Sequence, residues 1–272
     1  MRQMPSRIRN TGRWAVIASV LSAAAIPIAM GEPAWAQQGG AKQPKTVVKP
    51  ARDSESGQGA QRGSRGGFPA HWWAPVPEAQ KASWEVLPQA AKPGEVILSK
   101  RHELGILSNF AATPFTLRGK RYPGVEGFWQ MMLYPEGPDD PRARFAGITW
   151  PRTREEVAQM TAFAAKAAGT LGEENMKKMG IDWVTFEGKR IKYWSKEKGE
   201  HYRLIVEAMR AKLEQNPQVE EILLSTGDLV LLPDHIQEED PPAEWQYFKI
   251  WMELRSELQE KERQRRLAES KK

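Results

Sequence analysis

The stretch 107–135, LSNFAATPFTLRGKRYPGVEGFWQMMLYP, constrains the fold more than any other part of the sequence. A small polar turn precedes a short apolar alternation at 114–117, which predicts a strand. The run RGK at 118–120 predicts a tight turn into a returning strand. Pro123 suits the first turn of a helix, because the N–H that proline lacks has no partner there anyway. We therefore expect a helix from about Gly124 to Leu133.

This expected helix has an apolar face with one acidic exception. Val125, Phe128, Trp129 and Met132 follow the i, i+3, i+4, i+7 spacing of a buried face. Glu126 lies among them in the first turn. It could be a structural residue that complements the helix macrodipole, worth about 0.3–1 kcal/mol. It could instead be a pocket carboxylate that its large neighbours desolvate, available for acid/base chemistry.

Residues 107–130 resemble the opening motif of the NADAR (YbiA-like) family. That motif has a small-polar-Asn-Phe turn, Pro-Phe, a glycine hairpin, and then Pro, Glu and Gln around an aromatic pair. The matching residues are Asn109, Phe110, Pro114, Phe115, Gly119, Tyr122, Pro123, Glu126 and Gln130. A weaker resemblance extends over about 99–257 and includes AKAAG at 165–169, IDW at 181–183 and LLSTGD at 223–228. The resemblance implies one α-rich α+β domain with a few short strands, over 96–259.

The resemblance also implies an activity. Through the NADAR family, the chain resembles N-glycosidases that cleave the bond between ribose and a base or amine. Their substrates are ADP-ribosylated guanine or early riboflavin-pathway intermediates. Glu126 would stabilise an oxocarbenium-like ribose and activate water, and Trp183 would stack on the base or ribose. Asn109 and Gln130 would orient ribose hydroxyls or the water. The other substrate-binding candidates are Phe110, Lys166, Thr226, Asp228 and Trp245, and no cofactor or metal is expected.

Several of these assignments have ordinary structural alternatives. Trp183 would serve equally as a core residue, and Lys166 as a solvated helix charge. The sequence also departs from the family pattern. Gly127 stands where the family has His, and the acidic run 234–247, DHIQEEDPPAEWQY, keeps Trp245 but lacks the family's loop glycines. Glycines there would let the backbone approach a phosphate, so these departures weaken the case for phosphorylated substrates.

Two classes of function therefore stay open. The first is an exported N-glycosidase that acts on a ribosylated small molecule. The second is a non-catalytic exported module that binds a ligand or a protein on the same scaffold, since a fold does not by itself imply a function.

The first 36 residues have the pattern of a secretory signal peptide. A basic start with four Arg precedes an apolar run from Trp14 to Met30, and Ala34-Trp35-Ala36 fits a cleavage site. Cleavage after Ala36 would place the protein in the periplasm or outside the cell, with no stable membrane span. The alternative is an uncleaved anchor, which the short apolar run and its Pro27 disfavour. The chain has no cysteine, so it can form neither a disulfide nor a lipid-modified cysteine anchor.

Positive charge is concentrated near the N-terminus. The chain has a net charge of +6, but the leader contributes +3 and residues 37–67 contribute +4, so residues 68–272 have a net charge of −1. A basic surface is the usual sign of nucleic-acid binding. Residues 68–272 have no such excess of positive charge, so we expect no binding to free nucleic acid. The expected partner, a small ribosylated ligand, is what the family resemblance implies. Residues 37–67 are almost devoid of large apolar side chains, which predicts a disordered spacer.

The remaining segments follow from local patterns. Residues 68–95 are rich in Trp and Pro, which favours an irregular arm packed on the domain, or alternatively a partner-binding segment. Thr153 and Glu156 form a capping-box pattern that predicts one helix over 153–168, ended by Gly169. Further elements are a strand at 95–98, helices at 201–215, 219–224 and 248–258, a strand at 229–232, and a charged, solvated extension at 260–272.

Overall fold

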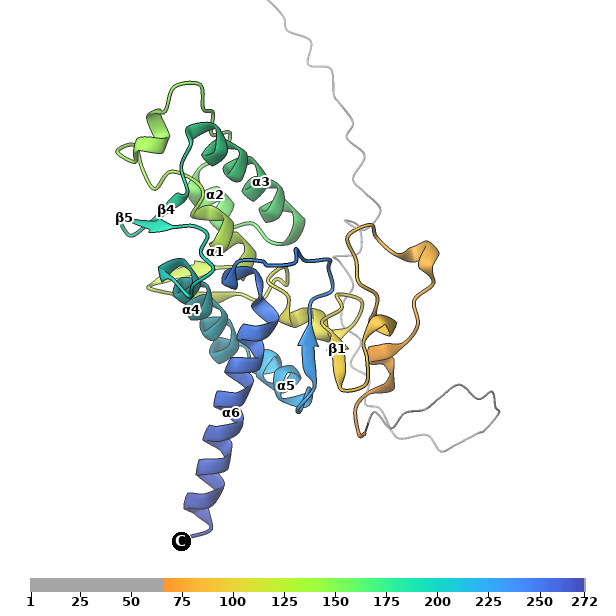
Figure 1. The fold of residues 1–272 in the computed structure, drawn as a ribbon. Helices are drawn as coiled ribbons and strands as arrows, with labels where there is room; N and C mark the ends of the chain where they lie inside the picture. The colour runs from red at the N-terminus through yellow and green to blue at the C-terminus, as the bar shows by residue number, and fades with distance from the viewer. Residues whose placement is uncertain (1–65, 272) are drawn as a thin grey trace, which may run out of the picture. The chain divides into compact units, whose positions relative to one another are not determined.

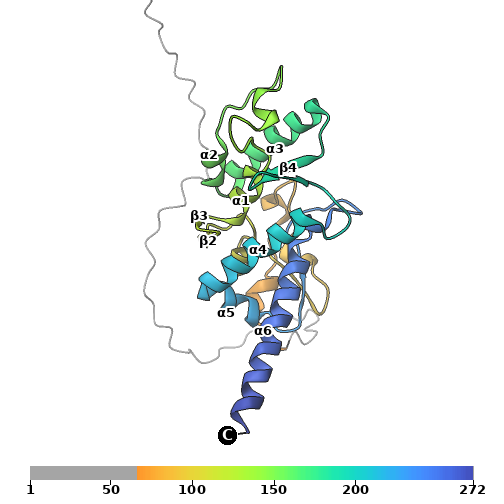
Figure 2. The same cartoon turned by 90° about the vertical axis from the view of Figure 1, so that its left-hand side faces the viewer.

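The computed structural model describes residues 66–271. The predicted signal peptide and nearly all of the predicted spacer lie outside these residues. The described part has the predicted α+β class, with six α-helices and three pairs of short strands. Helix α1 (Val125–Met131) lies between the pair formed by α2 (Arg154–Ala158) and α3 (Ala162–Met179) and helix α4 (Glu200–Gln215) (Figures 1 and 2). No helix within 66–271 has both the length and the apolar character needed to cross a membrane.

The hairpin and helix predicted from 107–135 are confirmed. Strands β2 (Phe115–Leu117) and β3 (Lys120–Tyr122) pair antiparallel, and the two turn residues, Arg118 and Gly119, both have positive φ, as tight hairpins require. Helix α1 (Val125–Met131) follows. All seven of its residues are buried, so it is the centre of the domain.

The helix predicted over 153–168 is wrong in one respect, because the chain forms two helices there. The capping box of Thr153 and Glu156 is present and starts α2 (Arg154–Ala158), but the chain breaks before α3 (Ala162–Met179). Ala162 has φ +50°, a strained value for alanine. The carbonyls at the end of α2 pack against Gly127 of α1, which is a tertiary constraint that local patterns do not contain.

The prediction that Gly169 ends a helix is wrong, because Gly169 lies in the middle of α3. A Cβ atom there would lie 1.8 Å from Oε1 of Gln130, and one at Gly172 would lie 2.6 Å from Cβ of Leu133. The two glycines therefore let α3 approach α1 closely. Gly180, with φ +65°, is the residue that ends α3.

The described chain after α3 contains the other three helices, and the first of them, α4, packs against α1. These helices are α4 (Glu200–Gln215), α5 (Pro217–Ser225) and α6 (Tyr247–Glu269). Strand β6 (Val230–Leu232) pairs in parallel with β1 (Glu95–Ile97), and β4 (Trp183–Phe186) pairs antiparallel with β5 (Lys189–Lys192). Helix α6 continues well beyond the predicted 248–258 and includes most of the charged residues from 260 onward.

Residues 68–95 form short 3₁₀ turns at Ala70–Trp73, Glu78–Gln80 and Pro88–Ala90. Trp72 and Trp73 are buried in the hydrophobic core. The Trp73 indole donates to the carbonyl of Glu95 (2.8 Å), and the Trp72 indole donates to a carboxylate oxygen of Glu103 (2.6 Å). These contacts tie the segment to the start of β1 and to the turn that follows it.

Candidate functional site

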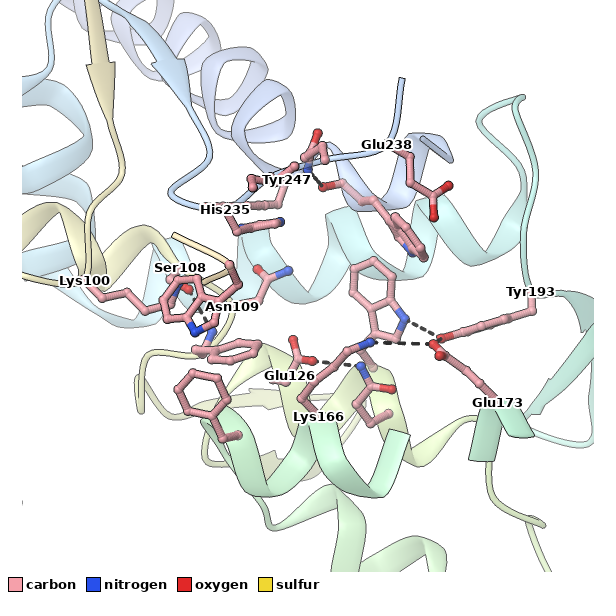
Figure 3. Close-up of a pocket in the computed structure, with 18 residues that line it drawn as sticks. Lys100, Ser108, Asn109, Glu126, Lys166, Glu173, Tyr193, His235, Glu238 and Tyr247 are labelled. Carbon is pink, nitrogen blue, oxygen red and sulfur yellow. Dashed lines mark hydrogen bonds and ion pairs between the residues drawn. The ribbon is translucent and has the colours of Figure 1, made fainter. Parts of the chain in front are cut away.

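A cavity of about 400 Å³ opens beside α1. Its wall combines α1 and α3 with the turn at 108–110 and the acidic run 234–247. Figure 3 shows Glu126 between Lys100 on one side and Glu173 and Tyr193 on the other. Six of the nine site residues predicted from the sequence line this cavity: Asn109, Phe110, Glu126, Gln130, Lys166 and Trp245.

Glu126 is a buried carboxylate with 5% of its surface exposed. Its Oε1 accepts a hydrogen bond from the Gln130 amide (2.8 Å), one helical turn along α1. Burial raises the pKa of Glu126 above its usual value. The hydrogen bond from Gln130 and the charges of Lys166 and Lys100 act in the opposite direction, but burial has the larger effect. Of the two interpretations of Glu126, this environment matches the desolvated carboxylate rather than an exposed helix-terminal charge.

The turn that carries Asn109 is held from behind by two buried side chains. The ammonium of Lys212, on α4, donates to the carbonyls of Ile106 (2.6 Å) and Ser108 (2.9 Å). The indole of Trp251, on α6, donates to the carbonyl of Leu107 (2.5 Å). Three consecutive carbonyls are thus fixed, and the next one, from Asn109, accepts the backbone N–H of Glu126 (3.1 Å). The turn and the start of α1 are therefore one rigid unit.

Two buried amide oxygens near Glu126 lack a hydrogen-bond partner within residues 66–271. They are Oδ1 of Asn109 and Oε1 of Gln130. A buried acceptor without a partner is costly, about 1–3 kcal/mol, and native proteins keep few of them. The oxygen of Asn109 belongs to a cavity-lining residue, so a ligand hydroxyl or a water could satisfy it.

Aromatic rings form part of the cavity wall. The rings of Phe110 and Phe163 meet edge to face at 5.1 Å, and Trp84 lies 5.9 Å from Phe163. Trp245 also lines the cavity and packs edge to face on Trp194 at 4.6 Å. Flat walls of this kind suit a heterocyclic base or the apolar face of a sugar.

Both lysines of the cavity have acidic neighbours. The Lys100 ammonium contacts both carboxylate oxygens of Asp234, at 2.7 and 2.6 Å. Burial alone would raise the pKa of Asp234, but His235 and Lys100 together hold it below its usual value. The Lys166 ammonium lies 3.8 Å from Glu173, which also accepts a hydrogen bond from the hydroxyl of Tyr193 (3.4 Å).

The other three predicted site residues lie elsewhere. Trp183, at the start of β4, lies outside the cavity. Its ring packs under the guanidinium groups of Arg190 (4.3 Å) and Arg142 (5.3 Å). The prediction that it stacks on a ligand near Glu126 is therefore wrong in this structure, because the β4–β5 hairpin directs it toward these two arginines.

Thr226 and Asp228 are also outside the cavity. Thr226 is fully buried, donates to the carbonyl of Leu223 (2.6 Å) and accepts from Arg255 (2.7 Å). Asp228 is exposed in the turn before β6. Both belong to the connection between α5, β6 and α6, so contact with a ligand beside Glu126 is not available to them.

The structure leaves no room for a side chain at Gly127, the position where the NADAR pattern has histidine. A Cβ atom at Gly127 would lie 2.2 Å from the carbonyl oxygen of Met160 and 2.9 Å from that of Ala158. No side chain fits in that space, so this domain closes the position where the family pattern has an imidazole.

Several cavity residues belong to no motif of the sequence. Trp84 comes from the irregular region before β1 and Lys100 from the region after it. Phe163 lies in the first turn of α3, and Tyr193 directly follows β5. Among these four residues, only Trp84 had a signal in the sequence, namely the high content of aromatic residues in 68–95. Within 66–271 no cluster of three or more potential metal ligands is present.

Comparisons with known proteins give one match. No protein-family model matches this chain, and no curated protein matches it. Among solved structures, the NMR structure of the E. coli protein YbiA aligns with a TM-score of 0.39 and 22% sequence identity, over 61% of this chain and 86% of that chain. The NADAR resemblance therefore rests on the motif at 107–130 and not on this alignment.

Proposed function

We propose that this protein is an N-glycosidase that hydrolyses the bond between ribose and a base or amine, with Glu126 as its catalytic carboxylate. The observation that supports it most is the position of Glu126. It is a buried acid with a raised pKa on an aromatic-walled cavity, beside an unpartnered acceptor from Asn109. The sequence resemblance to the NADAR family points to the same chemistry.

The reaction places modest demands on the protein. As the C1′–N bond breaks, ribose becomes oxocarbenium-like, and a nearby carboxylate stabilises that positive charge. The same carboxylate accepts a proton from the water whose oxygen bonds to C1′, and the departing nitrogen is protonated by solvent. A raised pKa brings Glu126 closer to the operating pH, where a general base is most effective.

Other cavity residues have supporting roles in this proposal. The rings of Phe110 and Phe163 hold the base, and Trp245 supplies a further aromatic wall. Gln130 fixes the Glu126 carboxylate through its 2.8 Å hydrogen bond. Asn109, held by the rigid turn, accepts a ribose hydroxyl or orients the water. This proposal gives the role of holding the base to these rings rather than to Trp183, because Trp183 does not line the cavity.

The test is release of free base from a panel of ribosylated bases, followed by chromatography. Wild type should release base from at least one compound, and Glu126→Gln should lower kcat by about 100-fold or more, the usual size of a general acid–base contribution. Glu174→Gln, which removes an exposed carboxylate from α3, is the matched control and should retain wild-type activity.

A non-catalytic binding module is the second candidate. The acidic run 234–247 and the closed position at Gly127 favour it, since both depart from the family pattern. In that case wild type and Glu126→Gln would bind a ligand alike, and neither would release base from any compound.

We also propose that the protein is exported, on the pattern of residues 1–36. The mature chain should then begin at Gln37. N-terminal sequencing of protein recovered from the cell envelope or medium tests this directly, and a mature chain that starts at Met1 would refute it.

A further inference from the structure

We infer that the Glu126 cavity selects a nucleoside-like ligand that carries no phosphate group. This inference rests on the proposed function, because it names the class of ribosylated substrate that the same site takes. It comes from the charge and hydrogen-bonding capacity of the cavity. Phosphate sites in proteins offer unpaired cations, bidentate arginines or free backbone N–H groups.

The positive charge of Lys100 is already paired with the carboxylate of Asp234. Its ammonium contacts both oxygens of the buried Asp234 and lies 5.1 and 5.2 Å from the ring centres of Trp84 and Phe110. Asp234 itself is 1% exposed. A phosphate that approached Lys100 would meet an ammonium with two of its three donors occupied and a carboxylate directly behind it.

Lys166 also has a carboxylate partner. Glu173 lies 3.8 Å from its ammonium, two helical turns along the same face of α3. Glu173 lines the cavity as well, so the cation that a phosphate would need comes with a negative charge at the same surface. Glu126 and Glu238 add two more acidic groups to the wall. Among residues 66–271, the cavity is lined by two lysines, three glutamates and no arginine.

Two backbone donors at the cavity are already bonded within the protein. The segment that replaces the family's glycine-rich loop contains Ile236, and its N–H is bonded to the carbonyl of Trp84 (3.1 Å). The backbone N–H of Glu126, at the start of α1, is bonded to Asn109. Three residues that line the cavity have a buried polar atom without a hydrogen-bond partner within residues 66–271. Two of these atoms, Oδ1 of Asn109 and Oε1 of Gln130, are acceptors, and the third is the hydroxyl of Tyr247, which can donate or accept. An acceptor pairs with a sugar hydroxyl or a base N–H, and a phosphate dianion has no donor to give it.

The experiment is isothermal titration calorimetry of wild-type protein with C-nucleosides, whose carbon–carbon glycosidic bond resists hydrolysis. The probes are formycin A and pseudouridine, each paired with its 5′-monophosphate. At least one nucleoside should bind about tenfold or more tightly than its monophosphate. Tighter or equal binding of the monophosphate, or no binding by either pair, would overturn the inference.

Two variants test the cause of the preference. Glu173→Gln removes the carboxylate partner of Lys166. The ratio of nucleoside affinity to monophosphate affinity should therefore fall several-fold. Glu174→Gln makes the same carboxylate-to-amide change at the neighbouring exposed residue and should leave this affinity ratio unchanged. If both variants behave alike, the pairing of Lys166 is not the cause and the inference fails.

The two proposals fail in different ways. Nucleoside preference without base release from any ribosylated compound would refute the N-glycosidase and leave this inference standing. Base release confined to phosphorylated compounds would refute this inference and leave the N-glycosidase standing.

Discussion

Replacing Glu126 with glutamine removes one buried negative charge with little change of shape. The wild-type carboxylate is 5% exposed and accepts one hydrogen bond, from Gln130. Removing a buried ion relieves a desolvation penalty of several kcal/mol, but it also weakens a charge-assisted hydrogen bond worth about 1.5–3 kcal/mol. A further loss of about 0.3–1 kcal/mol comes from the start of α1, where a carboxylate is favourable. We expect a net stabilisation of about 1–2 kcal/mol at neutral pH.

The pH dependence gives this prediction its sign. The folded-state pKa of Glu126 is raised above the unfolded value of roughly 4.3. The wild-type protein therefore loses stability as the pH rises from the unfolded to the folded pKa, and glutamine loses none. The two proteins should unfold alike at about pH 4. Above the folded pKa the variant should melt about 2–8 °C higher, at about 2–4 °C per kcal/mol for domains of roughly 150–250 residues.

The assay is thermal unfolding of wild type and Glu126→Gln from pH 4 to pH 9, followed by circular dichroism. Glu174→Gln serves as the control and should stay within about 0.5 kcal/mol of wild type, because its side chain is exposed. A Glu126→Gln protein that is less stable than wild type at pH 8 would show that the charge stabilises the helix, and it would remove the physical basis of the catalytic assignment.

Three further substitutions test the scaffold. Burial lowers the pKa of Lys212 to about 7, so the wild-type protein loses stability as the pH falls from about 10 to 7. Lys212→Met has no such amine, so its melting temperature relative to wild type should increase as the pH falls over that range. Gly169→Ala should cost about 1–3 kcal/mol in chemical unfolding, because its Cβ would overlap the Gln130 amide. Arg142→Met should cost about 3–5 kcal/mol in urea unfolding, because it leaves the buried Asp140 without its ion-pair partner.

Each of these has an outcome that contradicts it. A melting difference for Lys212→Met that is constant with pH would mean that this amine does not titrate there. A Gly169→Ala protein as stable as Ala167→Ser, a change at an exposed position of the same helix, would mean that α1 and α3 are not in close contact. An Arg142→Met protein that loses less than 1 kcal/mol would mean that Asp140 is solvated.

Local sequence patterns predicted the elements that local physics controls. The β2–β3 hairpin followed from its turn residues, α1 from Pro123 and its apolar spacing, and the start of α2 from its capping box. The break between α2 and α3 was not predictable in this way. It depends on carbonyls that pack against Gly127, so the cause lies on another helix.

The candidate site divides in the same manner. Glu126, Gln130 and Asn109 belong to one short motif, and the structure brings them to one cavity. Trp183 also belonged to a motif element, yet its hairpin turns it toward two arginines. Trp84 closes the cavity from an irregular segment with no motif, and only the tertiary fold could place it there.

The most direct test of the central claim is hydrolysis in H₂¹⁸O of a compound that wild type cleaves, with immediate borohydride reduction of the released sugar and mass spectrometry of both products. If water attacks ribose C1′ with Glu126 as base, the ¹⁸O label appears in the sugar and the released base is unlabelled, while Glu126→Gln gives almost no product. Label in the base would mean that water attacks the heterocycle, and equal product from both proteins would mean that Glu126 is not the catalytic carboxylate. Either result would contradict the account.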